Sequence, residues 1–262
     1  MFVTGGSGFL GRHVVRRATV AGWDVIAPSS QSMDITARSA TLATITGADA
    51  DVVVHLAYRK DDRRVIVDGT RHVAEAAAAA RSRLIHMSTD MVFAGRPTAY
   101  TEADEPDPII DYGRDKADAE LAAVAAMPDA AIIRTSLLYG TVDRSPFQID
   151  LERGRATGTS PMTFFSDEFR CPVHADDIAS AILRIADDSS ITGPLHVAGP
   201  ERVSRVDFAA ALAEHAGLGH IPLPTTTIAE SGMTRAANVV LDTALATALG
   251  IECRTLRDTL AT

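Results

Sequence analysis

The sequence predicts an α/β fold in which a parallel sheet is covered by helices on both faces. Three observations support this prediction. Short β-branched runs alternate with helical patterns through the first half of the chain, a glycine-rich turn follows the first run, and 46% of the residues are apolar. Strands separated by helices of this length form right-handed βαβ units, and such sheets bind ligands beyond the carboxyl ends of their strands.

The expected strands are short and apolar, as is usual for strands that are buried on both faces. They cover residues 1–3, 25–27, 52–56, 84–88 and 131–134, and the helices between them start at 9 and cover 36–44, 65–81 and 117–127. After residue 141 the pattern is less regular. There we expect helices at 147–154, 176–186 and 204–216, a loop at 222–227, and short helices near 242–249 and 255–260. Ser204 is the expected N-cap of its helix, and the last third should form a smaller lobe.

Composition excludes several classes of protein. The net charge of −9 and the lack of a Lys/Arg run argue against a nucleic-acid surface. Cys171 and Cys253 are too far apart in the sequence to suggest a metal motif, and they are typical of reduced thiols. The 262 residues contain no signal-peptide pattern and no apolar run long enough to span a bilayer. We therefore expect a cytoplasmic protein that binds no metal, nucleic acid or membrane.

The turn from Gly5 to Gly11 predicts a phosphate cradle. Its glycines fit both Gly-x-Gly-x-x-Gly and a wider Gly-x-x-Gly-x-x-Gly spacing, directly between a strand and a helix. Glycine permits the sharp turn and lets the backbone approach a pyrophosphate, which the N–H groups and dipole of the helix attract. This predicts a Rossmann-type, doubly wound sheet with a dinucleotide at Gly5, Gly8, Phe9, Leu10 and Gly11.

The region after the second expected strand favours NADP over NAD. Proteins of this type that bind NAD usually place an acidic residue there, whereas this chain has Pro28-Ser29-Ser30-Gln31. Without a carboxylate, a 2′-phosphate is not repelled. Arg12 is the nearest candidate for its cation and Arg38 the second. Asp34-Ile35 could bind the adenine amine, or Asp34 could cap the helix at 36–44. NAD remains possible.

Tyr112 and Lys116 form the candidate catalytic pair. Residues four apart share one face of a helix, and a nearby ammonium can lower the pKa of a phenol that serves as the general acid. Lys116 should also hold the nicotinamide ribose. Thr89 follows an expected strand, so its hydroxyl could polarise a substrate carbonyl. We prefer it to Ser88, and the neighbouring Asp90 could bind a substrate hydroxyl or a backbone N–H.

Seven ordered segments carry a resemblance to a known family. They are Thr4–Gly11, Met33–Thr36, Ser88–Gly95, Tyr112–Lys116, Arg134–Gly140, Pro172–Ala179 and Gly193–Pro200. The chain resembles the extended short-chain dehydrogenase/reductases, and within them the dTDP-4-dehydrorhamnose reductase group of sugar-nucleotide-binding proteins. The resemblance implies a catalytic trio of Thr89, Tyr112 and Lys116, and a cofactor lined by Leu56, Ala57, Thr135 and Leu137.

The resemblance also implies a division into two parts. Residues 1–141 and about 172–194 would form the NAD(P)-binding domain, and 142–171 with 195–262 the substrate-binding lobe. In that lobe Phe147, Arg170 and Arg235 are expected to contact the base or the phosphates of a nucleotide sugar, although each arginine could instead pair with a carboxylate such as Glu168. Two positions depart from the family pattern: Ile66 stands where relatives commonly have Asn, and Met91 where they usually have Tyr.

The leading hypothesis is an NAD(P)H-dependent reductase of a keto group on a nucleotide-linked deoxysugar, acting as a monomer or homodimer. The first alternative is an epimerase or dehydratase that retains its nicotinamide cofactor. The second is a catalytically inactive, NADP-binding regulatory subunit, because a fold alone does not establish activity.

Overall fold

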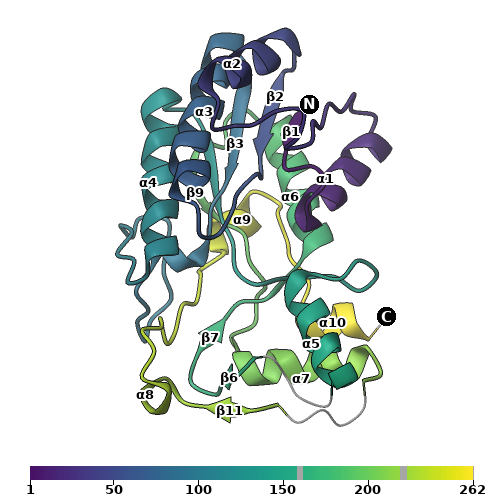
Figure 1. Ribbon diagram of the computed structural model, residues 1–262, viewed down its shortest axis with the longest axis vertical. Helices are drawn as coiled ribbons and strands as arrows, with labels where there is room; N and C mark the ends of the chain where they lie inside the picture. The colour runs from purple at the N-terminus through teal and green to yellow at the C-terminus, as the bar shows by residue number, and fades with distance from the viewer. Residues whose placement is uncertain (158–161, 219–222, 262) are drawn as a thin grey trace.

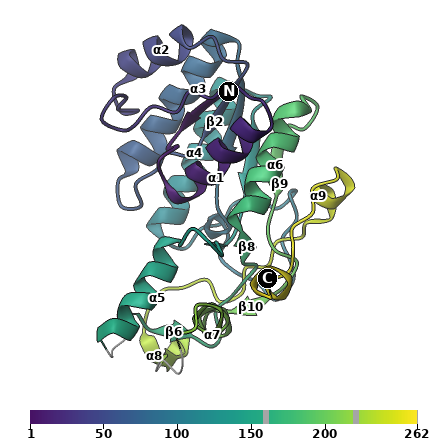
Figure 2. The same cartoon turned by 90° about the vertical axis from the view of Figure 1, so that its right-hand side faces the viewer.

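The computed structural model of the protein describes residues 1–157, 162–218 and 223–261. A larger part holds the main sheet, and a smaller part lies below it (Figure 1). The same division is visible from the side (Figure 2). None of the described helices is long and apolar enough to cross a membrane.

The main sheet is parallel throughout. Its strands, in spatial order, are β1 (Phe2–Thr4), β2 (Val52–His55), β3 (Arg83–Met87), β4 (Ala131–Arg134) and β9 (Gly193–His196). The Val52–Val54 run is almost completely buried because helices cover both faces of the sheet. The α/β prediction is therefore confirmed.

The strand expected at residues 25–27 is reduced to a single bridge. Ile26 pairs with Phe2 in parallel, through hydrogen bonds from Val3 N–H to Ile26 O at 2.8 Å and from Ile26 N–H to Met1 O at 3.0 Å. Pro28 follows at once and has no N–H to extend the ladder. Since Ile26 and β2 flank β1 on opposite sides, the strand order reverses at β1, and the glycine turn lies at that switch point.

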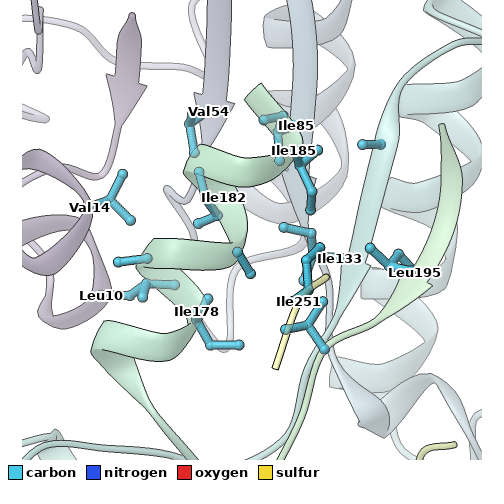
Figure 3. Close-up of a cluster of buried hydrophobic side chains, with 14 of the residues drawn as sticks. Leu10, Val14, Val54, Ile85, Ile133, Ile178, Ile182, Ile185, Leu195 and Ile251 are labelled. Atoms are coloured by element: carbon cyan, nitrogen blue, oxygen red, sulfur yellow. The ribbon is translucent and has the colours of Figure 1, made fainter. Parts of the chain in front are cut away.

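Two hydrophobic clusters fix the helices to the sheet. On one face lie α1 (Phe9–Val20) and α6 (Ala175–Asp187), and on the other α2 (Arg38–Gly47), α3 (Gly69–Ala80) and α4 (Asp111–Ala126). Leu10, Val14 and Ile182 fill the space between α1, α6 and the strands (Figure 3). Phe2 and Val53 point to the opposite cluster, because successive side chains of a strand alternate between faces.

Several helix boundaries differ from the sequence prediction. α4 begins at Asp111 instead of 117, so Tyr112 lies in its first turn. The helix expected over 65–81 is divided into a π-helical turn, η1 (Arg64–Asp68), and α3. α2 has Ala37 at its N-cap, with no side-chain cap. Asp34 instead accepts from Thr36 N–H at 2.9 Å, so the expectation that it caps α2 is wrong.

The smaller part combines short strands and helices. They are α5 (Pro146–Thr157), β6 (Phe164–Phe165), β7 (Phe169–Arg170), β10 (Val203–Ser204), α7 (Arg205–His215), β11 (Thr225–Thr226), α8 (Ile228–Ser231) and α10 (Leu256–Leu260). Ser204 caps α7 as expected, since its side chain accepts from Asp207 N–H at 3.1 Å. Within the expected loop at 222–227, Thr225–Thr226 forms a strand that pairs with β6, and Pro222 lies outside the described residues.

The chain passes between the two parts more than once. β5 (Leu138–Tyr139) pairs with β8 (Val173–His174), which leads into α6. Near the end of the chain, α9 (Ala244–Ala248) lies against β9, and Ala246 and Ile251 join the core of the main sheet. The division of the chain into two domains remains a prediction.

Candidate active site

Glycines shape the loop between β1 and α1. Gly5 has a φ of +70°, and a Cβ there would lie 2.8 Å from the backbone nitrogen of Ala57. A Cβ on Gly11 would collide with the carbonyl oxygen of Gly5. Gly8 N–H closes the turn by donating to Gly5 O at 3.0 Å. Because the first N–H groups of α1 have no partner within the helix, the turn offers them to an anion at the sheet edge.

The side chain of Thr4 ties the glycine turn to the end of β2. Its Oγ1 lies 2.7 Å from His55 Nδ1 and accepts from the backbone N–H groups of Leu56 and Ala57, both at 3.2 Å. His55 Nε2 lies 3.0 Å from Thr70 Oγ1. Burial lowers the pKa of His55 to about 3, so the ring is neutral at pH 7 and can bridge two hydroxyl groups. These contacts hold Leu56 and Ala57 beside the turn.

The structure brings Thr89, Tyr112 and Lys116 together at the carboxyl edge of the sheet. Thr89 follows β3, and its Oγ1 accepts from Met91 N–H at 3.2 Å, which caps the short helix η2 (Asp90–Val92). Tyr112 is half-buried in the first turn of α4, close enough to Thr89 for that hydroxyl to influence its pKa. Lys116 lies one turn further along α4 and is 5% exposed. Their catalytic roles remain predictions.

Gly113 allows this close approach of α4 to the turn after β3. A Cβ on Gly113 would collide with the carbonyl oxygen of Met91 and would lie 2.9 Å from Pro108 Cβ. The glycine that follows Tyr112 therefore determines how near the phenol comes to Thr89.

The expected influence of Lys116 on the pKa of Tyr112 is not found. Lys116 Nζ donates to the carbonyl oxygen of Met87 at 2.6 Å, and burial lowers the pKa of Lys116 to about 8, opposed by the charge of Glu120. The pKa of Tyr112 is raised, first by burial and then by the nearby Tyr58 and Asp90, and the neighbouring Thr89 hydroxyl opposes the shift. The prediction of a lowered phenol pKa is therefore wrong for the protein alone, since burial raises the pKa of Tyr112 and Lys116 is not among the groups that shift it.

A buried group of charges lies beside the trio. Arg170 is 1% exposed, and its guanidinium lies 3.3 Å from Glu168 Oε1 and 3.7 Å from Asp90 Oδ2. Arg235 Nε also donates to Glu168, and Arg205 Nε lies 3.9 Å from the same carboxylate. Three arginines therefore face two carboxylates, which leaves an excess of positive charge if both carboxylates are ionised.

Asp90 is held by contacts within the protein. Its Oδ2 accepts from Ser136 Oγ at 2.6 Å, and its Oδ1 accepts from Thr89 Oγ1 at 3.3 Å. Burial raises its pKa despite the opposing charge of Arg170. The sequence left two roles open for Asp90, binding a substrate hydroxyl or a backbone N–H. Among the described residues its side chain accepts from hydroxyl groups and not from a backbone N–H. A role in binding substrate remains a prediction.

Phe147 and the arginines of the lobe share a common surface. Phe147 stacks on Phe208 with ring centroids 5.4 Å apart, and the guanidinium carbon of Arg205 lies 4.7 Å from the centroid of the Phe147 ring. Phe147 is only partly buried. It therefore links the aromatic core of the lobe to the charged group around Glu168.

The remaining predicted cofactor residues lie around the glycine turn and at the strand ends. Leu10 and Ile35 turn their side chains into the two hydrophobic clusters, so only their backbone can reach a cofactor. Arg12 folds back and donates to Ser7 O at 3.0 Å. Thr135 and Leu137 follow β4, and Phe9 packs beside Gly140.

Several residues at the site had no signal in the sequence. Arg205 follows an N-cap serine, and its sequence context is that of an ordinary surface arginine. In the structure it nevertheless faces Glu168. His86 stacks on His55 with ring centroids 5.2 Å apart, and neither of its ring nitrogens has a partner within the described residues. Tyr58 lies 6.3 Å from Tyr112 between ring centroids. The one hint in the sequence is that Tyr58 directly follows Leu56-Ala57, two residues that were predicted to line the cofactor.

The arrangement fits a dinucleotide. The glycine turn is a cradle that a Cβ would fill. Thr135 Oγ1 is buried at a strand end and has no hydrogen-bond partner in the described part of the chain, so it is able to bond a ligand. The Thr89–Tyr112–Lys116 group lies at the same sheet edge, where such sheets bind their ligands.

The fold and this site define a Rossmann-type dinucleotide-binding protein with a Tyr-x-x-x-Lys pair. The chain belongs to the family described as "RmlD substrate binding domain", whose pattern matches residues 1–262.

Three similar proteins illustrate the range of this family. The chain is 35% identical to dTDP-4-dehydrorhamnose reductase of Mycolicibacterium smegmatis, over 82% of this chain and 68% of that protein. It is 30% identical to methionine adenosyltransferase 2 subunit beta of Rattus norvegicus, over 97% of this chain and 84% of that protein. The crystal structure of dTDP-4-dehydrorhamnose reductase from Bacillus anthracis, solved with NADP, has a TM-score of 0.88 at 22% identity and covers 99% of this chain and 96% of that one.

Proposed function

We propose that the protein is an NAD(P)H-dependent reductase that acts on a keto group of a nucleotide-linked deoxysugar. The observation that carries the proposal is the convergence of Thr89 and Tyr112, with Lys116 one helical turn away, at the same sheet edge as the glycine turn. The 35% identity to a dTDP-4-dehydrorhamnose reductase supports the substrate class.

The raised pKa of Tyr112 suits a residue that donates a proton during the reduction of a carbonyl. A reduced nicotinamide, when bound, supplies the hydride. Because the pKa of Tyr112 is raised, the phenol keeps its proton at neutral pH and can give it to the oxygen of the carbonyl. Thr89 donates a hydrogen bond to that oxygen, where negative charge develops. Lys116, whose ammonium donates to Met87 O, would hold the ribose hydroxyls of the nicotinamide when the cofactor is bound.

The charged group around Glu168 supports a phosphorylated substrate. Arg205 and Arg235 are 16% and 29% exposed and can each offer N–H groups to a diphosphate. Arg170 is almost completely buried, so its part is to hold Glu168 and Asp90. A cytoplasmic location and a monomeric or homodimeric state remain predictions.

The test combines a substrate screen with one variant. Keto-sugar nucleotides are tested for loss of reduced-nicotinamide absorbance with NADPH and with NADH. Tyr112→Phe, which removes only the donated proton, should abolish turnover and leave cofactor affinity within about two-fold of wild type. Retained turnover with lost cofactor affinity would contradict the role given to Tyr112.

The similarity to methionine adenosyltransferase 2 subunit beta favours one second candidate, a cofactor-binding subunit of another enzyme. This candidate predicts NADPH binding without turnover of any nucleotide sugar, together with a stable partner in a pull-down. The intact Tyr112–Lys116 pair favours the reductase. A retained-nicotinamide epimerase would instead copurify with its cofactor and consume no NADPH.

A further inference from the structure

The carboxyl ends of the main strands carry polar side chains on the face that α3 and α4 cover. Thr4, His55, His86 and Arg134 stand at or next to the ends of β1, β2, β3 and β4, and each is at most 3% exposed. The register of the strands places them on the same face as Leu84 of the hydrophobic cluster under these helices. A layer of buried polar groups therefore lies between that cluster and the sheet edge.

Glu120 is the carboxylate that enters this layer from α4. It is 6% exposed and lies one helical turn after Lys116. Arg134 donates to it from Nη2 at 2.8 Å and from Nε at 3.2 Å, and the hydroxyl of Ser88 donates to it as well. One carboxylate thus joins α4 to the ends of both β3 and β4.

The contact with Ser88 bears directly on Thr89. The backbone N–H groups on either side of Thr89 donate to carbonyl oxygens of β4 and of the residue that follows it, both at 2.7 Å. The side chain of Ser88 fixes the same backbone to α4 through Glu120. The place of the Thr89 hydroxyl relative to the helix that carries Tyr112 is therefore set from behind by this carboxylate.

Stability alone gives a weak reason for this arrangement. A buried ion pair contributes little to the free energy of folding, because the cost of removing both charges from water offsets their attraction. What the pair does provide is orientation. The guanidinium of Arg134 bonds both carboxylate oxygens of Glu120, which fixes the plane of that side chain.

Glu120 also supplies the negative charge that acts on Lys116. The titratable groups that neighbouring strands and α4 itself place around this layer are His55, His86, Arg134, Tyr112 and Glu120. Burial lowers the pKa of both histidines, so they are neutral at pH 7 and above. Tyr112 keeps its proton, because its pKa is raised. The charge of Glu120 opposes the fall in the pKa of Lys116.

The other elements packed on α4 carry charges that have partners of their own. Arg63, just before η1, is 57% exposed and is bound to two aspartates of α4. The contacts made by the titratable side chains of η1 and α3 are Arg64–Asp62, Arg71–Asp68, Arg38–Glu75 and His72–Ile35 O.

We infer that Glu120 is a positioning residue: its carboxylate fixes α4 against the ends of β3 and β4 and places a negative charge behind the ammonium of Lys116. The inference rests on the proposed function, because Thr89, Tyr112 and Lys116 are the groups that it positions. Glu120 is buried against Ser88 and Arg134, so it acts through its neighbours.

The first measurement follows the ionisation of Lys116 directly. The chain contains two lysines, so nuclear magnetic resonance of the full-length protein labelled with carbon-13 in its lysine side chains gives one signal for Lys116 and one for the exposed Lys60. Glu120→Gln keeps an oxygen that can accept from Ser88 and removes the charge. The titration midpoint of Lys116 should therefore fall by about one pH unit, while that of Lys60 stays where it is.

The second measurement is steady-state kinetics with NADPH and a reducible keto-sugar nucleotide. In Glu120→Gln the alkaline limb of the pH profile of kcat should move to lower pH by about the same amount as the midpoint of Lys116. Glu120→Asp restores the charge and should bring both values back to within about half a pH unit of wild type. Ser88→Ala keeps the charge and removes the tie to Thr89, so kcat should fall by about ten-fold with an unchanged pH profile and an unchanged KM for NADPH.

Asp177→Asn is the matched control for the loss of a buried carboxylate. Asp177 lies on α6, on the opposite face of the sheet, is 8% exposed and accepts from Arg254 Nη2 at 2.7 Å. Its substitution should lower the denaturant midpoint and leave both the titration of Lys116 and the pH profile of kcat unchanged.

The same Lys116 midpoint in Glu120→Gln and wild type, or an equal shift in Asp177→Asn, would overturn this inference and leave the proposed reductase standing. If Glu120→Gln does not fold, Ser88→Ala decides, and a wild-type kcat in that variant would overturn the inference. A wild type that reduces no keto-sugar nucleotide would overturn the proposed function, and the titration of Lys116 would still decide whether Glu120 acts on its charge.

Discussion

Lys116 shows how burial changes the chemistry of a single side chain. It is 5% exposed, and within the described residues its ammonium has one hydrogen-bond acceptor, the carbonyl oxygen of Met87. A buried ammonium is costly, and its pKa falls to about 8. A loss of folding stability of this kind is common at functional sites, where charged side chains are buried.

The pKa of Lys116 predicts a pH dependence of stability. Between its folded value of about 8 and the ordinary 10.5, the unfolded chain binds more protons, so the stability of wild type rises with pH. Below pH 8 both states are protonated and the full cost, about 3 kcal/mol, is present. Lys116→Met has no such cost. Its advantage in the free energy of unfolding over wild type should therefore shrink as the pH rises from 8 to 10.5, which urea denaturation at several pH values can measure.

The chain offers a matched control, since Lys60 is its other lysine and is exposed. Lys60→Met should keep a constant difference from wild type over the same range. A constant difference for Lys116→Met as well would mean that Lys116 titrates as if it were in water.

The sequence could predict that the candidate catalytic residues lie together, but not their protonation states. The four-residue spacing of Tyr112 and Lys116 is visible in any helix pattern, and the structure places both beside Thr89. The direction of the Tyr112 pKa depends on how deeply the phenol is buried, and spacing contains no information on depth. For the same reason the convergence of Arg205 on Glu168 could not be seen, because the two come from different segments.

At the scale of elements, the position of α4 depends on one glycine. Its first turn crosses the backbone after β3 so closely that a Cβ on Gly113 would meet Met91 O. A backbone oxygen cannot turn aside as a side chain can, so α4 itself would have to move.

Gly113→Ala should therefore destabilise the protein and separate Tyr112 from Thr89. Overpacking of this kind typically costs about 1–3 kcal/mol. We expect kcat to fall by about ten-fold or more, because small displacements of catalytic groups are costly, while the KM for the cofactor changes less. Denaturant midpoints and steady-state kinetics measure the two effects.

Gly47→Ala is the matched substitution, at the end of α2, where an added Cβ meets nothing within 4 Å. It should be neutral or slightly stabilising, because alanine favours helices more than glycine does. If both substitutions behaved alike, the close contact at Gly113 would have no influence on the site.

Helices and strands with a strong hydrophobic pattern were located more accurately from the sequence than those marked only by short local signals. The buried run Val52–Val54 and the amphipathic α6 were located to within two residues. The start of α4 was missed because Asp111-Tyr112-Gly113 has low helix propensity, which the contacts of the first turn override. The strand Thr225–Thr226 exists only through its pairing with β6, a non-local partner that a local pattern does not reveal.

At the scale of the whole molecule, Glu168 joins segments that are distant in the sequence. It is 2% exposed and faces Arg170 on β7, Arg205 at the start of α7 and Arg235 after α8. Its neighbour across the group, Asp90, lies after β3 of the main sheet. This carboxylate therefore neutralises charge that would otherwise push the lobe apart.

Glu168→Gln should destabilise the whole protein. Removing one partner of a buried ion pair typically costs about 3–5 kcal/mol, since the remaining charge stays buried. The midpoint of denaturant unfolding should fall accordingly, and Glu214→Gln, at an exposed position on α7, should leave it unchanged. Equal midpoints for the two variants would show that the arginines find other partners.

The core on the α1–α6 face has a consequence for how the chain acquires its structure. That core contains Leu10 and Val14 from the first helix and Ile251 from the last dozen residues (Figure 3). A ribosome must therefore release the chain through Ile251 before this core can be completed, and folding that waits for such distant contacts is slow. A fragment cut after the sixth helix would lack both β9 and Ile251, and it would leave apolar surface open to aggregation.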